Sequence, residues 1–347
     1  MSSRDVLIVG AGPSGLATAI ALQKRGVDYL VLEKGALVDG IQRFPTNMVF
    51  FTTPELMEIG GVPLTTPYDK PTRAEALQYY RKVTDAFQLN VLLHEEVLSI
   101  AQEERLAGEA ESDPRLFVVE TRSRLGVKRA RHARAVVLAM GYYNKANMLD
   151  VPGEDLPHVS HYYGEAHSFY RQRVVVVGGK NSSCEAALEL YRAGAHVTLV
   201  HRGPSLGDSV KYWVKPDVEN RIREGAIAAR FNTRVVEIRP TEVVLESTAE
   251  RSLWKGSSAE ERVTLPADAV LLLTGYHADP DFLRKAGVQV DAQTLMPHHD
   301  QATFETNVPN LFIAGGQLAG RRTGTVFIEN GRFHGEQIAK VIAQRLR

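Results

Sequence analysis

The chain contains very little cysteine: its 347 residues include one, Cys184. A single cysteine excludes an intrachain disulfide, a Cys-x-x-Cys redox pair and a cysteine-rich metal site. Any redox chemistry must therefore pass electrons on without a dithiol of the same chain. Cys184 follows a glycine turn, where a helix N-terminus can lower the pKa of a thiol. The simpler interpretation, which we favour, is a small residue buried in the fold.

The sequence also lacks an excess of one charge and a long apolar run. Its 41 basic and 41 acidic residues give a formal net charge of zero, so there is no basic footprint for nucleic acid. No uninterrupted apolar stretch reaches the roughly 18 residues that indicate a membrane span. The N-terminal MSSRDVLIVG enters a strand pattern directly, without the cleavage pattern of a signal peptide. We therefore expect a cytoplasmic protein with neither a nucleic-acid nor a membrane partner.

Glycines follow an apolar run near the N-terminus. The segment VLIVGAGPSG places Gly10, Gly12 and Gly15 between a strand pattern and a helix pattern, and Glu33 ends the next apolar strand. In dinucleotide-binding folds such glycines make a tight turn, admit the pyrophosphate and let the helix pack closely on the sheet. The pyrophosphate rests on free N–H groups at the helix N-terminus. An acid at the position of Glu33 accepts hydrogen bonds from a ribose 2′-hydroxyl, which predicts FAD or NAD.

A second, less regular turn occurs in VVVVGGKNSS. Gly178 and Gly179 follow its apolar run, and the next strand ends in His201 and Arg202. An arginine at this point accommodates a 2′-phosphate, which predicts NADPH. The alternative is a plain strand–helix turn that binds no nucleotide. A chain that holds both a flavin and a nicotinamide is most simply a flavin oxidoreductase.

Alternating strand and helix patterns predict an α/β fold with parallel sheets flanked by helices. The similar segments RAVVLAMGYY (134–143) and DAVLLLTGYH (268–277) indicate one nucleotide-binding fold used twice. The tail strand TNVPNLFIAGG (306–316) has no counterpart in the second copy, so we expect it to return to the first. We therefore predict two Rossmann-like three-layer domains: a discontinuous FAD-binding domain (1–157 and 290–347) and an NADPH-binding domain (158–289).

Further patterns complete this prediction. Helix patterns cover 54–59 and 72–87, and ENGRFHGEQIAKVIAQRLR predicts one final helix. The charged segments 102–115 and 248–262 are rich in turn-forming or polar residues, and we expect both to be solvated loops.

With these motifs in view, the chain resembles the two-dinucleotide flavoproteins of the thioredoxin-reductase-like group, and within it the bacillithiol-disulfide reductase family. The resemblance covers nearly the whole chain outside the two charged segments. It implies FAD and NADPH as cofactors, a low-molecular-weight disulfide as electron acceptor, and a homo-oligomer. The segments that carry it are GAGPSGLATAIAL, FPTNMVFFTTPELMEIG, MGYYNKANMLDVPGEDLP, GGKNSSCEAALEL and FIENGRFHGEQIA.

The resemblance also implies which residues bind the cofactors. FAD would be held by the first turn, the end of the following strand, and later strand ends: Gly10, Gly12, Pro13, Ser14, Gly15, Glu33, Lys34, Ile41, Val97 (at the adenine), Met140, Gly141 and Gly315. NADPH would be held by Gly178, Gly179, Asn181, Ser182, Ser183, His201 and Arg202, with Gly275 also close to a cofactor. We predict neither a catalytic side chain nor a metal site, because the cofactors carry the hydride chemistry.

Two positions depart from the pattern of the group. Members of the bacillithiol-disulfide reductase family carry a cysteine, a proposed reactive thiol, where this chain has Ser14. With no base identifiable beside it, we interpret Ser14 as a phosphate-turn residue rather than a nucleophile. Thioredoxin reductases have an acidic residue near Gly316 that contacts the ribityl chain, and this chain lacks it. We therefore expect weak reduction of bacillithiol disulfide.

Several alternatives remain for the acceptor. A ferredoxin- or flavodoxin-NADP reductase would pass electrons to a small redox protein, and a redox sensor would bind both cofactors without turnover. HYYGEAHSFY (161–170) nearly matches a flavin-monooxygenase signature, but the gap between Gly164 and His167 is one residue too short. His298, His299 and Asp300 indicate a surface loop, because three adjacent residues cannot all face one metal ion.

Overall fold

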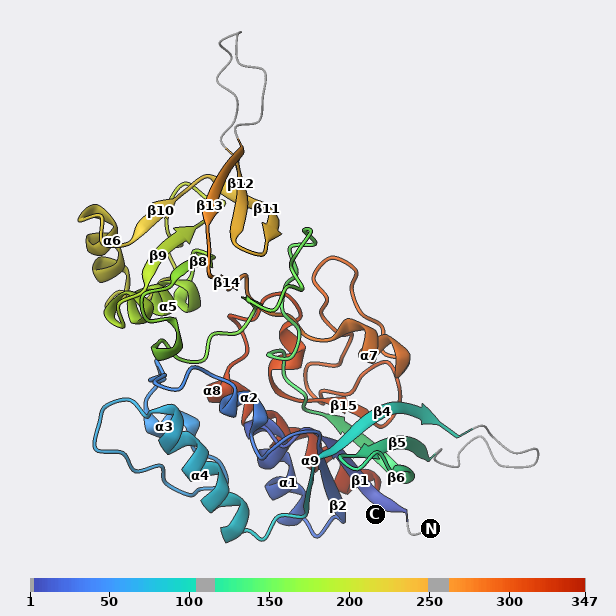
Figure 1. Ribbon diagram of the computed structural model, residues 1–347. Helices are drawn as coiled ribbons and strands as arrows, with labels where there is room; N and C mark the ends of the chain where they lie inside the picture. The colour runs from blue at the N-terminus through green and yellow to red at the C-terminus, as the bar shows by residue number, and fades with distance from the viewer. Residues whose placement is uncertain (1–2, 104–115, 249–261, 347) are drawn as a thin grey trace. The chain divides into compact units, whose positions relative to one another are not determined.

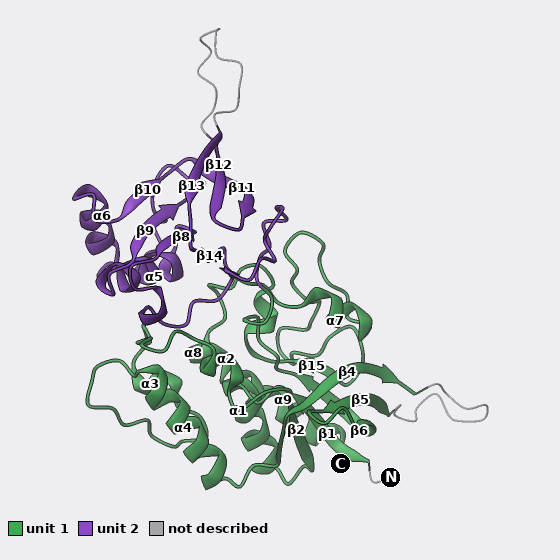
Figure 2. Ribbon diagram, in the orientation of Figure 1, with its two compact units in different colours: residues 1–145, 276–347 green, residues 146–275 purple. Residues whose placement is uncertain are grey.

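Residues 3–103, 116–248 and 262–346 are described by a computed structural model of the chain (Figure 1). Its contacts divide the chain into two units, residues 1–145 with 276–347 and residues 146–275 (Figure 2). The first unit is therefore discontinuous, as the returning tail predicted.

Both unit boundaries lie earlier in the chain than the predicted positions 157 and 289. The segment 146–157 packs on the second unit, where Leu149 and Leu156 join an apolar cluster of that unit's strands. The Ile238 N–H also donates a hydrogen bond of 2.8 Å to the Pro152 carbonyl. The segment 276–289 packs on the first unit through the buried Leu283 and Val288. Apolar contacts between residues that are far apart in the sequence therefore set the boundaries of the two units.

A seven-stranded sheet forms the centre of the first unit, in the order β3-β2-β1-β6-β5-β4 with β15 beside β6. The strands β3, β2, β1, β6 and β15 run parallel, whereas β5 and β4 are antiparallel additions. The pairing of β15 with β6 confirms the return of the tail. The bounds are β1 (Arg4–Val9), β2 (Tyr29–Glu33), β3 (Val91–Leu93), β4 (Glu95–Gln102), β5 (Phe117–Ser123), β6 (Lys128–Leu138) and β15 (Leu311–Ile313).

Alternate residues of β1 face opposite layers of this unit. Val6 and Ile8 pack with the long helices, and Leu7 and Val9 pack with the segment that contains α7 and with β4 and β5. Because side chains alternate along a strand, one apolar run serves both layers. The helices are α1 (Pro13–Gln23), α2 (Asp39–Gln42), α3 (Pro54–Met57), α4 (Arg73–Ala86), α7 (Pro280–Lys285), α8 (Ile328–Gly331) and α9 (His334–Arg345), with the 3₁₀ turn η2 (Gly315–Ala319).

Two of these helices illustrate how the sequence sets their limits. Thr72 and Glu75 form a capping box that begins α4 where the pattern predicted. The predicted final helix is instead two helices, α8 and α9. At the break, Arg332 Nη1 donates hydrogen bonds of 2.6 Å to the carbonyls of Glu55 and Glu58. The prediction of one helix was wrong: at the break the Phe333 N–H bonds to the Asn330 carbonyl, three residues back, and the helical pattern resumes only at His334.

The second unit has three layers as well. Its five-stranded parallel sheet, in the order β10-β9-β8-β14-β7, lies between α5 and α6 on one face and a three-stranded antiparallel sheet, β11-β12-β13, on the other. The elements are β7 (Val159–Ser160), η1 (His167–Phe169), β8 (Arg173–Val177), α5 (Asn181–Arg192), β9 (His196–Val200), α6 (Lys215–Arg223), β10 (Ala228–Arg230), β11 (Thr233–Arg239), β12 (Glu242–Ser247), β13 (Arg262–Pro266) and β14 (Ala269–Leu272).

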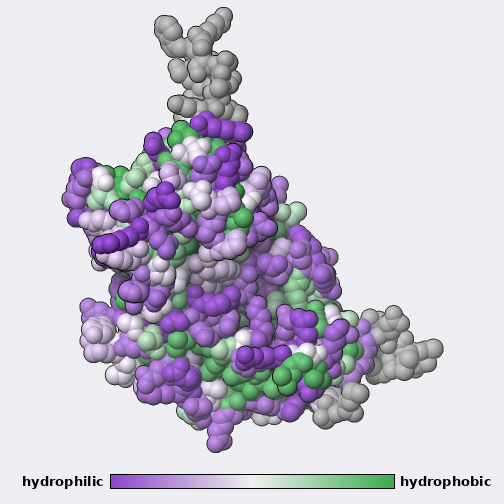
Figure 3. Space-filling model, in the orientation of Figure 1, coloured by the Kyte–Doolittle hydropathy of each residue, from purple (hydrophilic) through white to green (hydrophobic). Residues whose placement is uncertain are grey.

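The two units confirm the prediction of two Rossmann-like domains in an α/β fold. Most residues of the predicted charged loops, 104–115 and 249–261, lie outside the described part of the chain. Within the described part, no helix is both long and apolar enough to cross a membrane. The face drawn in Figure 3 is mostly hydrophilic, with apolar side chains scattered over it.

Candidate functional site

The first glycine turn connects β1 to α1, and each glycine has a different steric role. Gly10 has φ +106°, and a Cβ there would come 2.5 Å from the Ala139 carbonyl oxygen. A Cβ at Gly15 would overlap the carbonyl oxygen of Gly10, so this position needs the close approach of helix and strand. A Cβ at Gly12 would meet nothing within 4 Å among the described residues. The open space at Gly12 fits a pyrophosphate lying against the backbone.

Glu33 joins the end of β2 to this turn. Its Oε2 accepts a hydrogen bond from the Ala11 N–H, and its Oε1 accepts one from the Gly35 N–H, both at 2.8 Å. The side chain is 7% exposed, and burial raises the pKa of its carboxyl. The acid that was predicted to receive a ribose hydroxyl therefore also fixes the shape of the phosphate turn.

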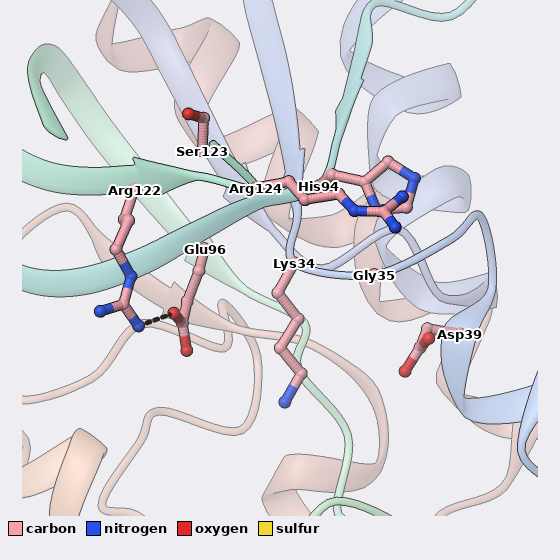
Figure 4. Close-up of a pocket in the computed structure, with 8 residues that line it drawn as sticks. All are labelled: Lys34, Gly35, Asp39, His94, Glu96, Arg122, Ser123 and Arg124. Atoms are coloured by element: carbon pink, nitrogen blue, oxygen red, sulfur yellow. Dashed lines mark hydrogen bonds and ion pairs between the residues drawn. The ribbon is translucent and has the colours of Figure 1, made fainter. Parts of the chain in front are cut away.

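An open pocket of about 470 Å³ lies beside the end of β2 (Figure 4). Lys34 lines it, and Arg122 Nη2 donates a hydrogen bond of 2.6 Å to Glu96 Oε2 at its edge. Val97, the next residue along β4, packs against the apolar core and is not among the described lining residues. Lys34 thus faces open space, while the predicted contacts of Lys34 and Val97 with an adenosine stay predictions. The lining residues are Lys34, Gly35, Asp39, His94, Glu96, Arg122, Ser123 and Arg124.

Ser14 lies in a crevice formed by glycines from the tail of the chain. A Cβ at Gly315 would come 2.8 Å from the Ser14 Cβ, and a Cβ at Gly331 would come 3.0 Å from its Oγ. Only glycine at these two positions leaves room for the hydroxyl without a shift. The first turn and the returning tail therefore meet at Ser14.

His334 holds the same part of the tail and was not singled out by the sequence. Its Nδ1 accepts a hydrogen bond of 3.1 Å from the Gly315 N–H, and its ring stacks on Phe304 with centroids 4.3 Å apart. Burial lowers the pKa of His334 to about 4, and nearby His299 adds to the effect. The imidazole is therefore neutral at pH 7 and able to accept.

Other residues predicted to contact FAD occupy varied surroundings. Pro13 is the first residue of α1, where a missing N–H has no cost, and Gly141 has φ +66°. Ile41 is 3% exposed and packs in the main apolar core. Met140 packs against the cluster on the opposite face of the sheet. Pro13 and Gly141 thus suit the local backbone conformation, whereas Ile41 contributes to packing.

The second turn is closed by a side chain rather than by glycine. Ser183 Oγ donates a hydrogen bond of 2.8 Å to the Lys180 carbonyl and accepts one of 3.1 Å from the Lys180 N–H. Gly178 has φ +147°, and a Cβ there would come 2.6 Å from the Leu273 carbonyl oxygen. A Cβ at Gly179 would come 2.5 Å from the His201 ring. His201 therefore covers the turn, and its pKa is lowered by burial and by the charge of Arg202.

Asn181 attaches a loop to the start of α5. Its Nδ2 donates a hydrogen bond of 3.1 Å to the Ser209 carbonyl, and its Oδ1 accepts one of 2.8 Å from the Lys211 N–H. The adjacent Ser182 is exposed. Of these two predicted NADPH ligands, Ser182 is therefore the more available, while Asn181 shapes the loop.

Arg202 lies beside a second arginine that the sequence did not single out. The His201 N–H donates a hydrogen bond of 2.9 Å to the Arg230 carbonyl, and the Asn232 N–H donates one of 2.8 Å to the Gly203 carbonyl. These bonds hold the backbone on both sides of Arg202 against the end of β10. Arg202 and Arg230 are both exposed. The carboxyl ends of β9 and β10 therefore present two guanidinium groups, and only the pairing of these strands reveals the second.

Cys184, Gly275 and Asp300 have the following surroundings. Cys184 is completely buried, and burial raises the pKa of its thiol to about 11, which supports an inert packing role. Gly275 has φ +92° and its carbonyl accepts a hydrogen bond of 2.9 Å from the Asn147 N–H. Asp300 caps its own turn by accepting from the N–H groups of Ala302 and Thr303. No metal-ligand cluster of three residues occurs among the described residues.

Comparison with known proteins identifies the family. The pyridine nucleotide-disulphide oxidoreductase pattern matches residues 7–315, which include both glycine turns. The chain belongs to this family. It is 41% identical over 345 residues to bacilliredoxin reductase Bdr of Bacillus subtilis, which covers 99% of each chain. The solved bacillithiol disulfide reductase Bdr of Bacillus cereus is 42% identical, with a TM-score of 0.90 and coverage of 99% of this chain and 100% of that one. A thioredoxin reductase of Lactococcus lactis, 19% identical, shares the fold with a TM-score of 0.71 and coverage of 99% and 98%.

Family membership confirms the predicted resemblance and the predicted cofactor classes. The protein is a flavoprotein oxidoreductase that uses FAD and NAD(P)H. The residues fit these groups at the first turn, where a Cβ at Gly12 would meet nothing within 4 Å among the described residues and the backbone is open to a pyrophosphate.

Proposed function

We propose that this enzyme transfers two electrons from NADPH through FAD to bacillithiol disulfide. In the balanced reaction one NADPH, one proton and one disulfide give NADP⁺ and two thiols. The observation that carries the proposal is similarity along the whole chain, at 41% identity, to a bacilliredoxin reductase, together with 42% identity to a structure described as a bacillithiol disulfide reductase. Both glycine turns lie within that similarity.

We place FAD in the first unit. The backbone N–H groups at the start of α1 face the space left open at Gly12, and the positive end of the helix dipole favours an anion there. Glu33 fixes the turn and retains lone pairs for a ribose hydroxyl, while Lys34 lines the adjoining pocket. Bound FAD supplies the electron-transfer chemistry, and these residues bind and orient it.

We place NADPH in the second unit, with its 2′-phosphate at Arg202 and Arg230. Charge-assisted contacts of a guanidinium to phosphate are stronger than contacts between neutral groups. The second turn contributes the N–H groups at the start of α5, and Ser183 holds that turn in shape. The two arginines together favour NADPH over NADH.

The disulfide has to be reduced without a thiol of this chain. Cys184, the one cysteine, is buried in the second unit and its raised pKa keeps it protonated. Ser14 occupies the position at which related enzymes carry a thiol, and its hydroxyl is poorly ionised near pH 7. The electrons that bound FAD would supply would therefore reach the S–S bond without a mixed disulfide to a cysteine of this chain. We expect slow turnover for this reason.

The test is anaerobic oxidation of NADPH by the FAD-loaded enzyme with bacillithiol disulfide, glutathione disulfide, cystine, quinones and a flavodoxin offered separately. We expect bacillithiol disulfide to give the highest rate among the disulfides, with two thiols formed per NADPH consumed. Cys184→Ala is the matched control and should leave this rate unchanged. Faster reduction of flavodoxin or a quinone than of every disulfide would contradict the proposed acceptor.

We further propose that the enzyme is a homo-oligomer, because its family resemblance implies this, and we keep the separate expectation that it is cytoplasmic. Light scattering during size-exclusion chromatography of the FAD-loaded protein should give a multiple of the 38.3 kDa chain mass. A mass of one chain at micromolar concentration would contradict this part of the proposal.

A further inference from the structure

Two aromatic side chains are exposed next to each other in the loop that follows β9. Tyr212 is 82% exposed and Trp213 is 44% exposed. They are the central residues of a turn in which the Val214 N–H donates a hydrogen bond of 2.9 Å to the Lys211 carbonyl. Their rings pack edge to face, with centroids 4.7 Å apart. Single exposed apolar residues are common, whereas large aromatic residues exposed together mark a surface that can bind a ligand or partner.

The loop that carries this pair is anchored to the core and to the second turn. Three of its apolar side chains are buried in the main cluster of the second unit: Leu206, Val210 and Val214. The Gly207 N–H donates a hydrogen bond of 2.8 Å to the Gly179 carbonyl. Asn181, at the start of α5, accepts one of 2.8 Å from the Lys211 N–H. The residue before Tyr212 is therefore fixed against the turn that we assign to NADPH.

The chain path places the pair at the edge of the sheet where Arg202 and Arg230 lie. Strands β9 and β10 are adjacent and parallel, and α6 makes the connection between them (Figure 1). A helix that connects two parallel strands begins near the carboxyl end of the first strand and runs back toward the amino end of the second. Tyr212 and Trp213 come shortly before α6 begins at Lys215, so they lie at the carboxyl edge, beside the ends of β9 and β10.

The chemistry of the nucleotide determines which of its groups can meet an aromatic side chain at this edge. A 2′-phosphate held by Arg202 belongs to a ribose that carries adenine on the adjacent carbon. The nicotinamide lies beyond the pyrophosphate, at the other end of the molecule. Adenine has a flat π face, and stacking of a base on an aromatic side chain contributes about 1–3 kcal/mol. The exposed ring of Tyr212 therefore suits adenine.

We propose that Tyr212 stacks on the adenine ring of NADPH and that Trp213 supports the tyrosine ring from its edge. This inference rests on the proposed placement of NADPH in the second unit. Tyr212 thereby recognises the base, while Arg202 and Arg230 recognise the 2′-phosphate. Both parts of the site come from segments that begin or end at the same edge of the sheet.

The first test measures binding of 2′,5′-ADP and of NADP⁺ to the FAD-loaded, full-length enzyme by calorimetry, since neither ligand reduces the flavin. Tyr212→Ala should weaken both about fivefold or more, equal to about 1 kcal/mol. Tyr212→Phe keeps the ring and should bind both as the parent does. Tyr170→Ala is the matched control, because Tyr170 is an exposed tyrosine just before β8, at the opposite edge of the same sheet, and it should change neither affinity.

Three results of this test would overturn the proposal. The first is unchanged affinity of Tyr212→Ala for 2′,5′-ADP. The second is a loss for NADP⁺ alone, which would place the ring of Tyr212 at the nicotinamide. The third is an equal loss in Tyr212→Phe, which would assign the effect to the hydroxyl rather than to stacking.

Thermal unfolding separates a ligand contact from a structural role. Because Tyr212 is exposed, Tyr212→Ala should leave the Tm of the nucleotide-free enzyme unchanged. A lower Tm together with weaker nucleotide binding would assign Tyr212 to the fold of the loop and overturn the proposal.

Tryptophan fluorescence reports the contact directly. The chain has two tryptophans, Trp213 and Trp254, and Trp254 lies outside the described residues. In Trp254→Phe, saturating 2′,5′-ADP should change the emission of Trp213, whereas inorganic phosphate, which lacks a base, should not. No response to 2′,5′-ADP would overturn the proposal, and so would an equal response to phosphate.

Arg202→Ala reports separately on the placement of the nucleotide. Full affinity of Arg202→Ala for 2′,5′-ADP would refute the second-unit site itself. A loss in Arg202→Ala without a loss in Tyr212→Ala would keep that site and overturn the stacking alone. Because these measurements contain no disulfide, their failure is distinguishable from failure of the proposed acceptor.

Discussion

Arg202 and Arg230 offer the sharpest test of nucleotide choice. Their strands are adjacent and parallel, and hydrogen bonds of 2.9 Å (His201 N–H to Arg230 carbonyl) and 2.8 Å (Asn232 N–H to Gly203 carbonyl) hold the backbone on both sides of Arg202. Neighbouring strands lie about 4.8 Å apart, so two long guanidinium side chains can reach one phosphate between them. A hydrogen bond to a charged group contributes about 1.5–3 kcal/mol, which corresponds to a change in affinity of roughly 10- to 150-fold.

We therefore expect Arg202→Ala to raise the KM for NADPH by roughly 10- to 150-fold. Arg230→Ala should raise it in the same direction, and both variants should leave the KM for NADH within twofold of the parent. If both arginines hold one phosphate, the effects in the double variant should not add, because the two sites share a partner. Arg223→Ala removes an exposed arginine from α6 of the same unit and should change neither constant.

The assay is steady-state oxidation of NADPH and NADH at several ionic strengths, with ferricyanide as a fast acceptor. The KM for NADPH should rise with ionic strength more steeply in the parent than in Arg202→Ala, because salt screening weakens exposed charge pairs. Equal use of NADPH and NADH by the parent would refute the assignment of Arg202. An effect of Arg230→Ala on both nucleotides alike would refute the role of Arg230.

Three further predictions concern the first unit. Gly12→Leu should purify without yellow colour, because its side chain fills the space of the pyrophosphate; a normal flavin spectrum would contradict this. Ser14→Cys should raise the rate with bacillithiol disulfide, because even an unperturbed cysteine is partly thiolate at pH 7.5, while Ser14→Ala should match the parent; no gain for the cysteine variant would refute the need for a thiol. The pKa of His334 is about 4, below its ordinary value of 6.5. The contribution of the neutral imidazole to the free energy of unfolding is therefore complete above pH 6.5 and is lost as the pH falls toward 4. Chemical denaturation should show a loss of about 2 kcal/mol over that window, and His334→Asn should lack it; parallel pH profiles for parent and variant would refute this.

The features that could be predicted are those that appear as residue patterns along the sequence. Gly15 meets a steric demand within one strand–turn–helix unit and Gly10 has φ +106°, so their spacing is visible along the chain. The apolar tail strand ending at Ile313 could be assigned to the first domain because it had no partner in the second. The start of α4 was likewise predicted at Thr72, where the structure has a capping box with Glu75.

The features that could not be predicted depend on contacts between distant segments. Arg230 becomes a candidate only once β10 is known to lie beside β9, since nothing local distinguishes it from other exposed arginines. The hydrogen bond from the Gly315 N–H to His334 is of the same kind. The sequence therefore predicts where nucleotides bind, and the structure adds candidate side chains that only strand pairing brings to those turns.

The central claim is that electrons pass from NADPH through FAD to a small disulfide without a protein thiol. The most direct measurement is an anaerobic single-turnover experiment, in which the FAD-loaded enzyme is reduced with one equivalent of NADPH and then mixed with bacillithiol disulfide. The account predicts return of the oxidised flavin absorbance with two thiols released per flavin, at the same rate in Cys184→Ala and Ser14→Ala. Flavin that stays reduced in the presence of the disulfide, yet reoxidises promptly with a flavodoxin or a quinone, would contradict it.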